Sequence, residues 1–215
     1  MGSELLLGLA DKSLTKDGLR RRVEQDFGLV PVLLEGTGSA KAAVRYGCSK
    51  VLMDLSAEHP KRLYRYMDQF VGLLDSKYRI LTWNALAIIA NLAEVDVDKK
   101  FDAIFDKYYG FLDNEYMVTV ANTVGNSGKI ASAKPYLIPR ITKELLKVEH
   151  VHVTPHLTEE CKRVIAENTI KTFDLFFDEL EEKEKKKVLD FVERQLNSSR
   201  RTLSEKAKTF LEKRR

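Results

Sequence analysis

The sequence predicts an all-α protein built from repeated helical hairpins, and three observations predict this fold class. Apolar residues recur at three- and four-residue spacings along most of the 215 residues, whereas the two-residue alternation of β-strands is nearly absent. A set of five apolar positions beginning at Val44 returns 37 residues later, beginning at Leu81. The segment LLDSKY (Leu73–Tyr78) is similar to FLDNEY (Phe111–Tyr116), which lies 38 residues later. Such a period, with two helices in each unit, is typical of stacked helical repeats.

The individual helices follow from the apolar spacing and from the turn residues between them. We expect Asp75 and Asp113, at the repeated unit ends, to cap the helices that follow them. The predicted hairpins are 15–26 with 28–35, 40–57 with 60–74, 78–94 with 98–112, 115–130 with 134–148, and 157–180 with 183–197, followed by a last helix over 200–214.

The repeated hairpins resemble HEAT and armadillo-type repeats over residues 37–197. The segment VANTVGNSGKIA (Val120–Ala131) is similar to the small-residue first helix of short HEAT-like units. The resemblance implies a right-handed α–α superhelix, an α-solenoid of about four to five HEAT-like hairpins. Residues 1–36 are expected to form N-terminal capping helices and residues 198–215 a basic C-terminal helix, all within one continuous domain.

Composition favours a soluble protein inside the cell. Hydrophobic residues make up 44% of the chain and charged residues 32%, which is typical of a well-packed globular protein. The longest strongly apolar stretch, Ala85–Ala93, is far shorter than the roughly 20 residues that cross a bilayer. The N-terminal apolar run is too short for a secretory signal. We therefore expect a cytoplasmic protein, with Cys48 and Cys161 as buried free thiols.

Catalytic and cofactor motifs are not matched. GNSGKI at 125–130 lacks the earlier glycine and the following Ser or Thr of a phosphate loop, and GTGSAK at 36–41 lacks a preceding strand. No nucleophile occupies a recognisable elbow. The sequence therefore predicts no catalytic residue and no cofactor. A DNA glycosylase of the HEAT-like class, with Trp83 in a base-flipping pocket, is a distant third interpretation, because Trp83 is more simply explained by packing between units.

A histidine-rich segment between two predicted helices raises the question of a metal site. EHVHVTPHLTEEC (149–161) contains His150, His152 and His156, together with carboxylates and Cys161, and imidazole and thiolate suit zinc or nickel. No known ligand spacing is matched, and the segment stretches the connection between units. We therefore predict an exposed inter-repeat loop that contacts a partner, and no metal.

The predicted binding surface lies on the second helices of the hairpins, which usually line the concave face of a solenoid. Their outward residues form a basic track dotted with tyrosine, which suits an acidic protein segment or a nucleic-acid backbone, while a solvated face explains it equally well. The track consists of Arg62, Arg65, Tyr66, Gln69, Lys100, Lys107, Tyr109, Arg140, Lys143 and Lys147.

Two further features bear on function. The predicted helix at 115–130 is unusually polar, with Thr119, Asn122, Thr123, Asn126 and Ser127, and either close helix packing or a polar ligand groove explains it. The net charge of +4 is concentrated in 200–215, where seven Lys or Arg stand against two Glu. The leading interpretation is a non-catalytic scaffold that binds protein partners through its concave face. The alternative is nucleic-acid binding through the track and the basic C-terminal helix.

Overall fold

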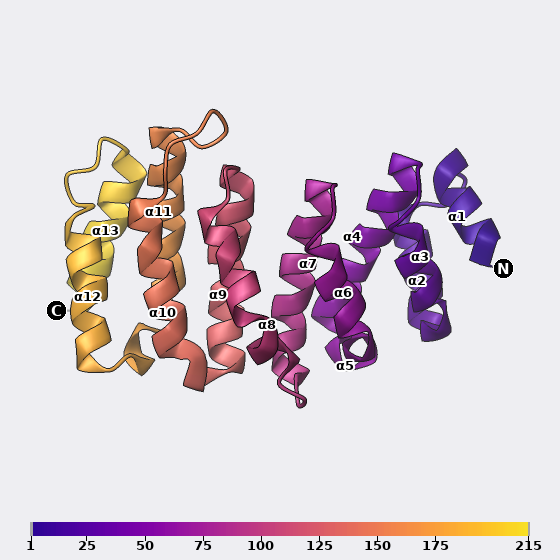
Figure 1. Ribbon diagram of the computed structural model, residues 1–215, viewed down its shortest axis with the longest axis horizontal. Helices are drawn as coiled ribbons and strands as arrows, with labels where there is room; N and C mark the ends of the chain where they lie inside the picture. The colour runs from indigo at the N-terminus through magenta and orange to yellow at the C-terminus, as the bar shows by residue number, and fades with distance from the viewer. Residues whose placement is uncertain (1, 215) are drawn as a thin grey trace. The chain divides into compact units, whose positions relative to one another are not determined.

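The protein is helical along nearly all of residues 2–214, which the computed structural model describes (Figure 1). Among these residues the only β pairing is an isolated bridge between Thr154 and Leu157. The α-helices are α1 (Gly2–Asp11), α2 (Lys16–Gln25), α3 (Val30–Gly36), α4 (Ala42–Glu58), α5 (Pro60–Leu63), α6 (Met67–Leu73), α7 (Arg79–Leu92), α8 (Lys100–Tyr109), α9 (Met117–Ala133), α10 (Ile138–Leu146), α11 (Glu159–Asp174), α12 (Glu182–Glu193) and α13 (Arg201–Arg214). Short 3₁₀ helices are η1 (Phe27–Leu29), η2 (Tyr64–Tyr66), η3 (Ala93–Val95), η4 (Gly110–Asp113), η5 (Pro135–Leu137), η6 (Lys147–His150) and η7 (Phe177–Glu179).

The predicted all-α class and solenoid organisation are confirmed, with local differences. Helix α1 was not predicted; it buries Leu5 and Leu9, which lie one turn apart on its face. The helix expected over 60–74 is divided into α5, η2 and α6. The prediction that Asp75 and Asp113 cap the following helices is wrong, because α7 and α9 begin after Tyr78 and Tyr116 without a side-chain cap. In the turns before them, Ser76 Oγ accepts a hydrogen bond from the Tyr78 amide and Asn114 Oδ1 accepts one from the Tyr116 amide.

The chain forms two compact units, residues 1–101 and 102–215. In the first unit, α4 and α7 pack along each other, α1, α2 and α3 cover α4, and α5 and α6 pack on α7. In the second unit, α9, α11 and α13 lie side by side in one row, and α10 and α12 form the adjoining layer (Figure 1). The expected boundaries at residues 36 and 197 remain predictions.

Polar contacts within each unit recur at about one repeat. In the first unit, the side-chain amide of Asn84 donates to Ser49 Oγ at 2.8 Å, and that of Asn91 donates to Ser56 Oγ at 2.9 Å, both across 35 residues. In the second unit, Arg140 donates to Asp106 at 3.0 Å across 34 residues. The repeat therefore appears in the hydrogen bonds as well as in the apolar spacing.

Arg45 is a buried cation in the first unit. Its guanidinium donates to the carbonyl oxygens of Ser39, at 2.7 Å, and Ala40, at 3.2 Å. The same group lies 4.6 Å from the ring centroid of Tyr46 and 3.6 Å from that of Tyr78. Only 5% of Arg45 is exposed. The residue thereby fixes the turn before α4 to the start of α7 through cation–π and hydrogen-bonding contacts.

Two glycines make close contacts, and substituting each by alanine should have opposite effects. A Cβ at Gly36 would lie 2.5 Å from Cys48 Sγ inside the core, so Gly36→Ala is expected to destabilise the protein by about 2 kcal/mol. A Cβ at Gly128 would meet the tip of Leu175, a side chain that is 65% exposed and free to move. Gly128→Ala should therefore be neutral or stabilising by up to about 1 kcal/mol. Urea unfolding of both variants measures the difference, and equal losses would contradict it.

The cysteines and the helix lengths complete the description of the fold. Cys48 is buried as expected, and burial raises the pKa of its thiol to about 12, whereas Cys161 is only half-buried. Among the described residues, no helix has both the length and the apolar character needed to span a bilayer.

Candidate binding surface on helix α9

Packing explains part of the polar sequence of α9. Thr119, Thr123 and Ser127 are all buried. The hydroxyls of Thr123 and Ser127 donate to the carbonyl oxygens four residues earlier, at 3.1 and 2.8 Å. The bonds of Thr123 and Ser127 satisfy their hydroxyls within the helix, so these small residues can be buried without unpaired donors. Close helix packing thus accounts for this side of the helix.

The other side of α9 has two asparagine amides and an exposed glycine. Asn122 and Asn126 are half-buried, and each side-chain amide nitrogen donates to a carbonyl oxygen one turn back, that of Val118 at 2.8 Å and that of Asn122 at 2.9 Å. Gly125 lies between them, exposed and in the middle of a helix of 17 residues. A Cβ at Gly125 would meet no atom within 4 Å among the described residues. Two oriented amides therefore flank an open strip of backbone.

Helix α11 extends this surface within the same unit. The Thr172 hydroxyl donates to the Val124 carbonyl oxygen at 3.1 Å, which fixes the register between α11 and α9. Asn168, one turn before Thr172, is half-buried on the side of α11 that turns toward α9. At the far end, the exposed Leu175 covers Gly128. We call Asn122, Gly125, Asn126 and Asn168 the amide face.

The chemistry of the amide face suits recognition of a peptide backbone. An asparagine amide that spends one N–H on its own helix keeps an oxygen acceptor and a second N–H donor. Its orientation is fixed by the intrahelical bond, so binding costs little side-chain entropy. The missing side chain at Gly125 leaves room for another backbone to come close. The asparagines of α7 in the other unit differ, because the side-chain amides of Asn84 and Asn91 donate hydrogen bonds to serines of the neighbouring helix α4 and not to carbonyl oxygens of their own helix.

Gly125→Ala is expected to stabilise the free protein by up to about 1 kcal/mol, because alanine favours an exposed helix interior and the added methyl group meets nothing. Urea unfolding followed by circular dichroism measures this change. A loss of stability would show that Gly125 has a packing role in the free protein, and would remove the reason to connect it with a ligand.

The part of the predicted basic track in the first unit is exposed but partly neutralised. Arg62, Arg65 and Gln69 are exposed and Tyr66 is half-buried. The Arg62 guanidinium lies 5.5 Å from the centroid of the Phe27 ring. Lys100 forms an ion pair with Asp68 at 2.7 Å. The acidic residue therefore cancels part of the field that a phosphate backbone would need.

The part of the track in the second unit differs more from the prediction. Tyr109 is only 2% exposed, because α8 packs both of its tyrosines inward, so the prediction of Tyr109 as a surface residue is wrong. Arg140 pairs with Asp106 at 3.0 Å and Lys147 pairs with Glu144 at 2.5 Å. Lys107 and Lys143 are exposed. Here too, carboxylates accompany the basic residues.

The histidine segment forms an exposed loop fastened to the start of α9. The ring of His156 stacks on that of Tyr116 with centroids 4.5 Å apart, and the Thr154 hydroxyl donates to the Glu115 carbonyl oxygen at 2.7 Å. His150, His152 and His156 are exposed. Over the described residues, these three imidazoles do not converge with one another or with acidic or thiol groups into a set of three metal ligands.

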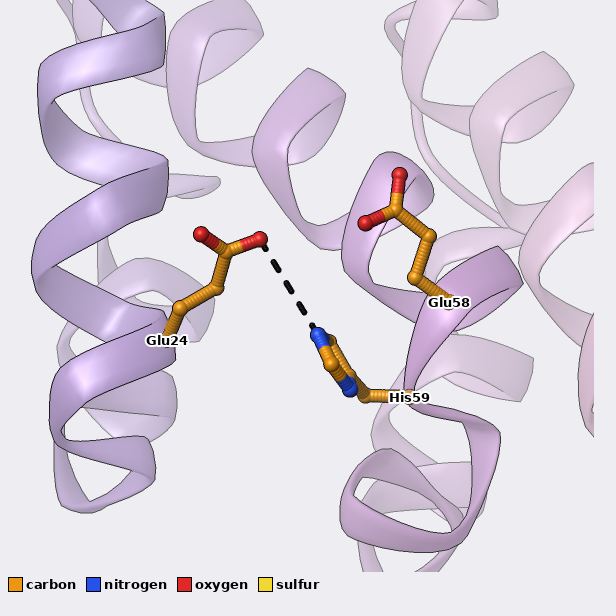
Figure 2. A group of neighbouring side chains, drawn as sticks. All are labelled: Glu24, Glu58 and His59. Atoms are coloured by element: carbon orange, nitrogen blue, oxygen red, sulfur yellow. Dashed lines mark ion pairs between the residues drawn. The ribbon is translucent and has the colours of Figure 1, made fainter.

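Three possible metal ligands do converge elsewhere, at residues that match no metal-binding sequence motif. Oxygen atoms of Glu24 and Glu58 and a nitrogen of His59 lie within 4.8 Å of one another in the first unit (Figure 2). Arg20 already lies between the two carboxylates, donating to Glu24 at 2.9 Å and to Glu58 at 2.5 Å. A metal ion would have to displace this guanidinium, so the cluster is best described as an ion-pair network joining α2 to the end of α4.

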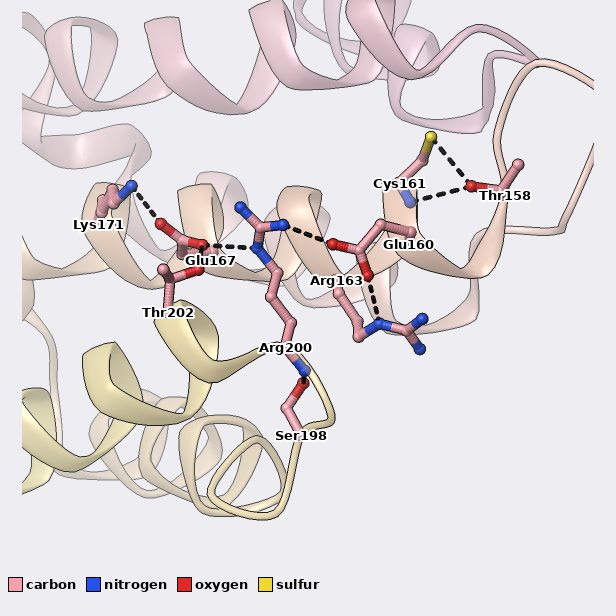
Figure 3. Close-up of polar contacts among 9 residues, drawn as sticks. All are labelled: Thr158, Glu160, Cys161, Arg163, Glu167, Lys171, Ser198, Arg200 and Thr202. Atoms are coloured by element: carbon pink, nitrogen blue, oxygen red, sulfur yellow. Dashed lines mark hydrogen bonds and ion pairs between the residues drawn. The ribbon is translucent and has the colours of Figure 1, made fainter.

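A second network joins α13 to α11 (Figure 3). Glu167, which is 9% exposed, accepts hydrogen bonds from Lys171, Arg200 and Thr202 at 2.6, 3.0 and 2.7 Å. Burial would raise the pKa of Glu167, but these donors outweigh it and lower the pKa to about 2. Arg200 also donates to Glu160 at 2.5 Å. Much of the C-terminal basic charge is therefore engaged by acidic residues, and α13 buries Leu203, Ala207, Phe210 and Leu211.

Comparison with known proteins bears on the fold. No protein-family model and no curated protein matches the sequence. Among solved structures, a designed armadillo repeat protein in complex with the peptide (KR)4 matches with a TM-score of 0.65 and 15% identity, over 96% of this chain and 90% of that chain. A second designed armadillo repeat protein matches at 0.61, with 18% identity over 98% of this chain and 92% of that chain. The chain has an armadillo/HEAT-type helical repeat fold.

In this armadillo/HEAT-type chain, sequence reasoning missed two members of the amide face. Gly125 was considered only as part of a phosphate loop that fails, and Asn168 was not singled out. The available signal was a glycine in the interior of a predicted helix, where it costs about 1 kcal/mol relative to alanine and so calls for a reason. The register that brings Asn168 beside α9 is a tertiary contact, which the spacing of residues does not give.

Proposed function

We propose that this protein is a non-catalytic scaffold that binds an extended segment of a protein partner on the amide face. The observation that carries the proposal is the open backbone at Gly125 between the oriented amides of Asn122 and Asn126. An extended peptide presents alternating N–H and C=O groups, which these amides match as acceptors and donors.

The structural neighbours agree with this mode of use. One designed armadillo repeat protein is solved in complex with the peptide (KR)4, and another, with a TM-score of 0.60 and 18% identity over 96% of this chain and 89% of that chain, was designed for modular peptide recognition. Repeat proteins present rows of similar positions on successive helices, and such rows suit extended ligands. The proposal transfers this mode of use, and not the peptide sequence, to the present chain.

Selection of binders from a random dodecapeptide library tests the proposal. We expect peptides that bind the wild-type protein and lose at least about tenfold in affinity for Gly125→Leu, whose side chain covers the open backbone. Ala103→Leu adds the same side chain to an exposed helical position on α8 and is the matched control. Asn122→Ala and Asn126→Ala should each cost about tenfold, the value of one well-formed hydrogen bond to a desolvated peptide. Selected peptides that bind Gly125→Leu as well as the wild type would overturn the proposal.

A further inference from the structure

A separate groove in the second unit lies between the ends of two helices. It has a volume of about 430 Å³ and is bordered by α8 with η4 on one side and by α10 with η6 on the other. Its apolar floor comes from Tyr109, Leu112 and Val151, which are 2%, 4% and 7% exposed. Gly110 also lines it, and a Cβ there would meet no atom within 4 Å. We call this cavity the α8–α10 groove.

The charged rim of the groove carries more carboxylate than cation. Asp106, Asp113 and Glu144 line it. Arg140 neutralises Asp106 and Lys147 neutralises Glu144. Three carboxylates against two cationic side chains leave one carboxylate in excess, and His150 also lies at the rim.

Asp113 is the carboxylate without a counter-ion among the described residues. The sequence predicts a capping role for Asp113, but α9 begins without a side-chain cap, and in the turn before it Asn114 Oδ1 accepts a hydrogen bond from the Tyr116 amide at 3.0 Å. The side chain of Asp113 is therefore exposed at the mouth of the groove with its charge available. Helices α8 and α10 both end here, and the carbonyl groups at helix C-termini favour positive charge.

We propose that the α8–α10 groove binds an organic cation, a guanidinium or primary ammonium group carried on an aliphatic stem. The apolar floor accommodates the stem, Asp113 pairs with the cationic head, and the volume is within the range of small-ligand sites. The cation comes either from an arginine or lysine side chain of a protein or from a free polyamine, because both present the same chemistry. The groove is built from α8 and α10, whereas the amide face is on α9 and α11, so this inference does not depend on the proposed function.

Amide chemical shifts in two-dimensional NMR test the inference with defined probes. Agmatine and spermidine represent the free cations, and acetyl-Gly-Arg-Gly-amide represents a protein side chain. The citrulline analogue of that peptide keeps its shape without the charge. We expect at least one cationic probe to shift the amides of 109–113 and 144–151, and the citrulline peptide to leave them unchanged. Binding by agmatine or spermidine alone identifies a free amine as the ligand, and binding by the arginine peptide identifies a protein side chain.

Variants of the groove complete the test. Asp113→Asn is expected to weaken binding about fivefold, as for loss of one partly exposed charge pair, and Gly110→Leu should abolish it by filling the cavity. Asp17→Asn removes one exposed carboxylate from the other unit and should leave binding unchanged. Since each variant is assayed by localised shifts on a folded spectrum, misfolding is seen directly. Equal binding of the citrulline peptide, no shift with any cation, or unchanged binding by both Asp113→Asn and Gly110→Leu would overturn the inference.

Discussion

Arg45→Ala is expected to lower the free energy of unfolding of the first unit by about 3 kcal/mol. The substitution removes charge-assisted hydrogen bonds to the carbonyl oxygens of Ser39 and Ala40 and leaves a cavity where the buried guanidinium lay. It also removes the cation–π contacts with Tyr46 and Tyr78. Urea unfolding followed by fluorescence of Trp83 measures the loss, because this single tryptophan lies on α7 of the same unit.

Two further variants show whether the contacts or the charge alone matter at this position. Arg45→Lys keeps the charge but lacks the planar fork that reaches both carbonyl oxygens, so an intermediate loss of about 1–2 kcal/mol is expected. Arg21→Ala removes an exposed arginine from α2 and should change stability by less than about 0.5 kcal/mol. A loss for Arg45→Ala as small as that for Arg21→Ala would mean that the buried guanidinium does not hold the turn.

Acid is expected to destabilise the second unit through Glu167. The folded-state pKa of about 2 lies below the ordinary value of 4.5, so this carboxylate contributes stability above pH 4.5 that is lost as the pH falls toward 2. A shift of this size corresponds to on the order of 3 kcal/mol. Urea unfolding followed by circular dichroism between pH 7 and pH 2 should show the loss.

Glu167→Gln separates this residue from other acids. Hydrogen bonds from Ser13 lower the pKa of Asp11, and those from Arg163 and Arg200 lower that of Glu160, so the wild-type curve contains several contributions. The variant should be less stable at pH 7 and less sensitive to acid, and the difference between the two curves should vanish near pH 2. Glu159→Gln removes an exposed carboxylate from the same helix as the control. Parallel curves for Glu167→Gln and the wild type would contradict the role of Glu167.

Much of the fold was predictable because the repeated helices have apolar residues at corresponding positions, so the repeat period can be seen in the sequence. The apolar set that begins at Val44 and returns at Leu81 defines α4 and α7, which pack along each other in the first unit. Helix α1 was missed because it is short and precedes the periodic region. The predicted caps are wrong because α7 and α9 begin after Tyr78 and Tyr116 without side-chain caps, and the polar residues Ser76 and Asn114 form the preceding turns instead.

The binding surface was less predictable because it depends on contacts between residues far apart in the chain. The sequence of its own helix predicts that Arg140 is an exposed basic residue. In the structure it forms an ion pair with Asp106, which is 34 residues earlier in the chain. The register of a single helix predicts that Tyr109 lies on the surface. In the structure, both Tyr108 and Tyr109 of α8 are buried. The sequence shows that the helix near residue 120 is polar, but only the structure separates its buried hydroxyls from its half-buried amides.

The central claim is that Asn122 and Asn126 recognise the backbone of an extended peptide, and N-methylation of a selected peptide tests it most directly. Each N-methyl group removes one backbone N–H donor without changing the side chains. We expect one or more positions at which N-methylation costs at least about tenfold in affinity for the wild-type protein but has little further effect on Asn122→Ala or Asn126→Ala. A peptide that binds equally well at every N-methylated position, with affinity set by its side chains alone, would contradict the claim.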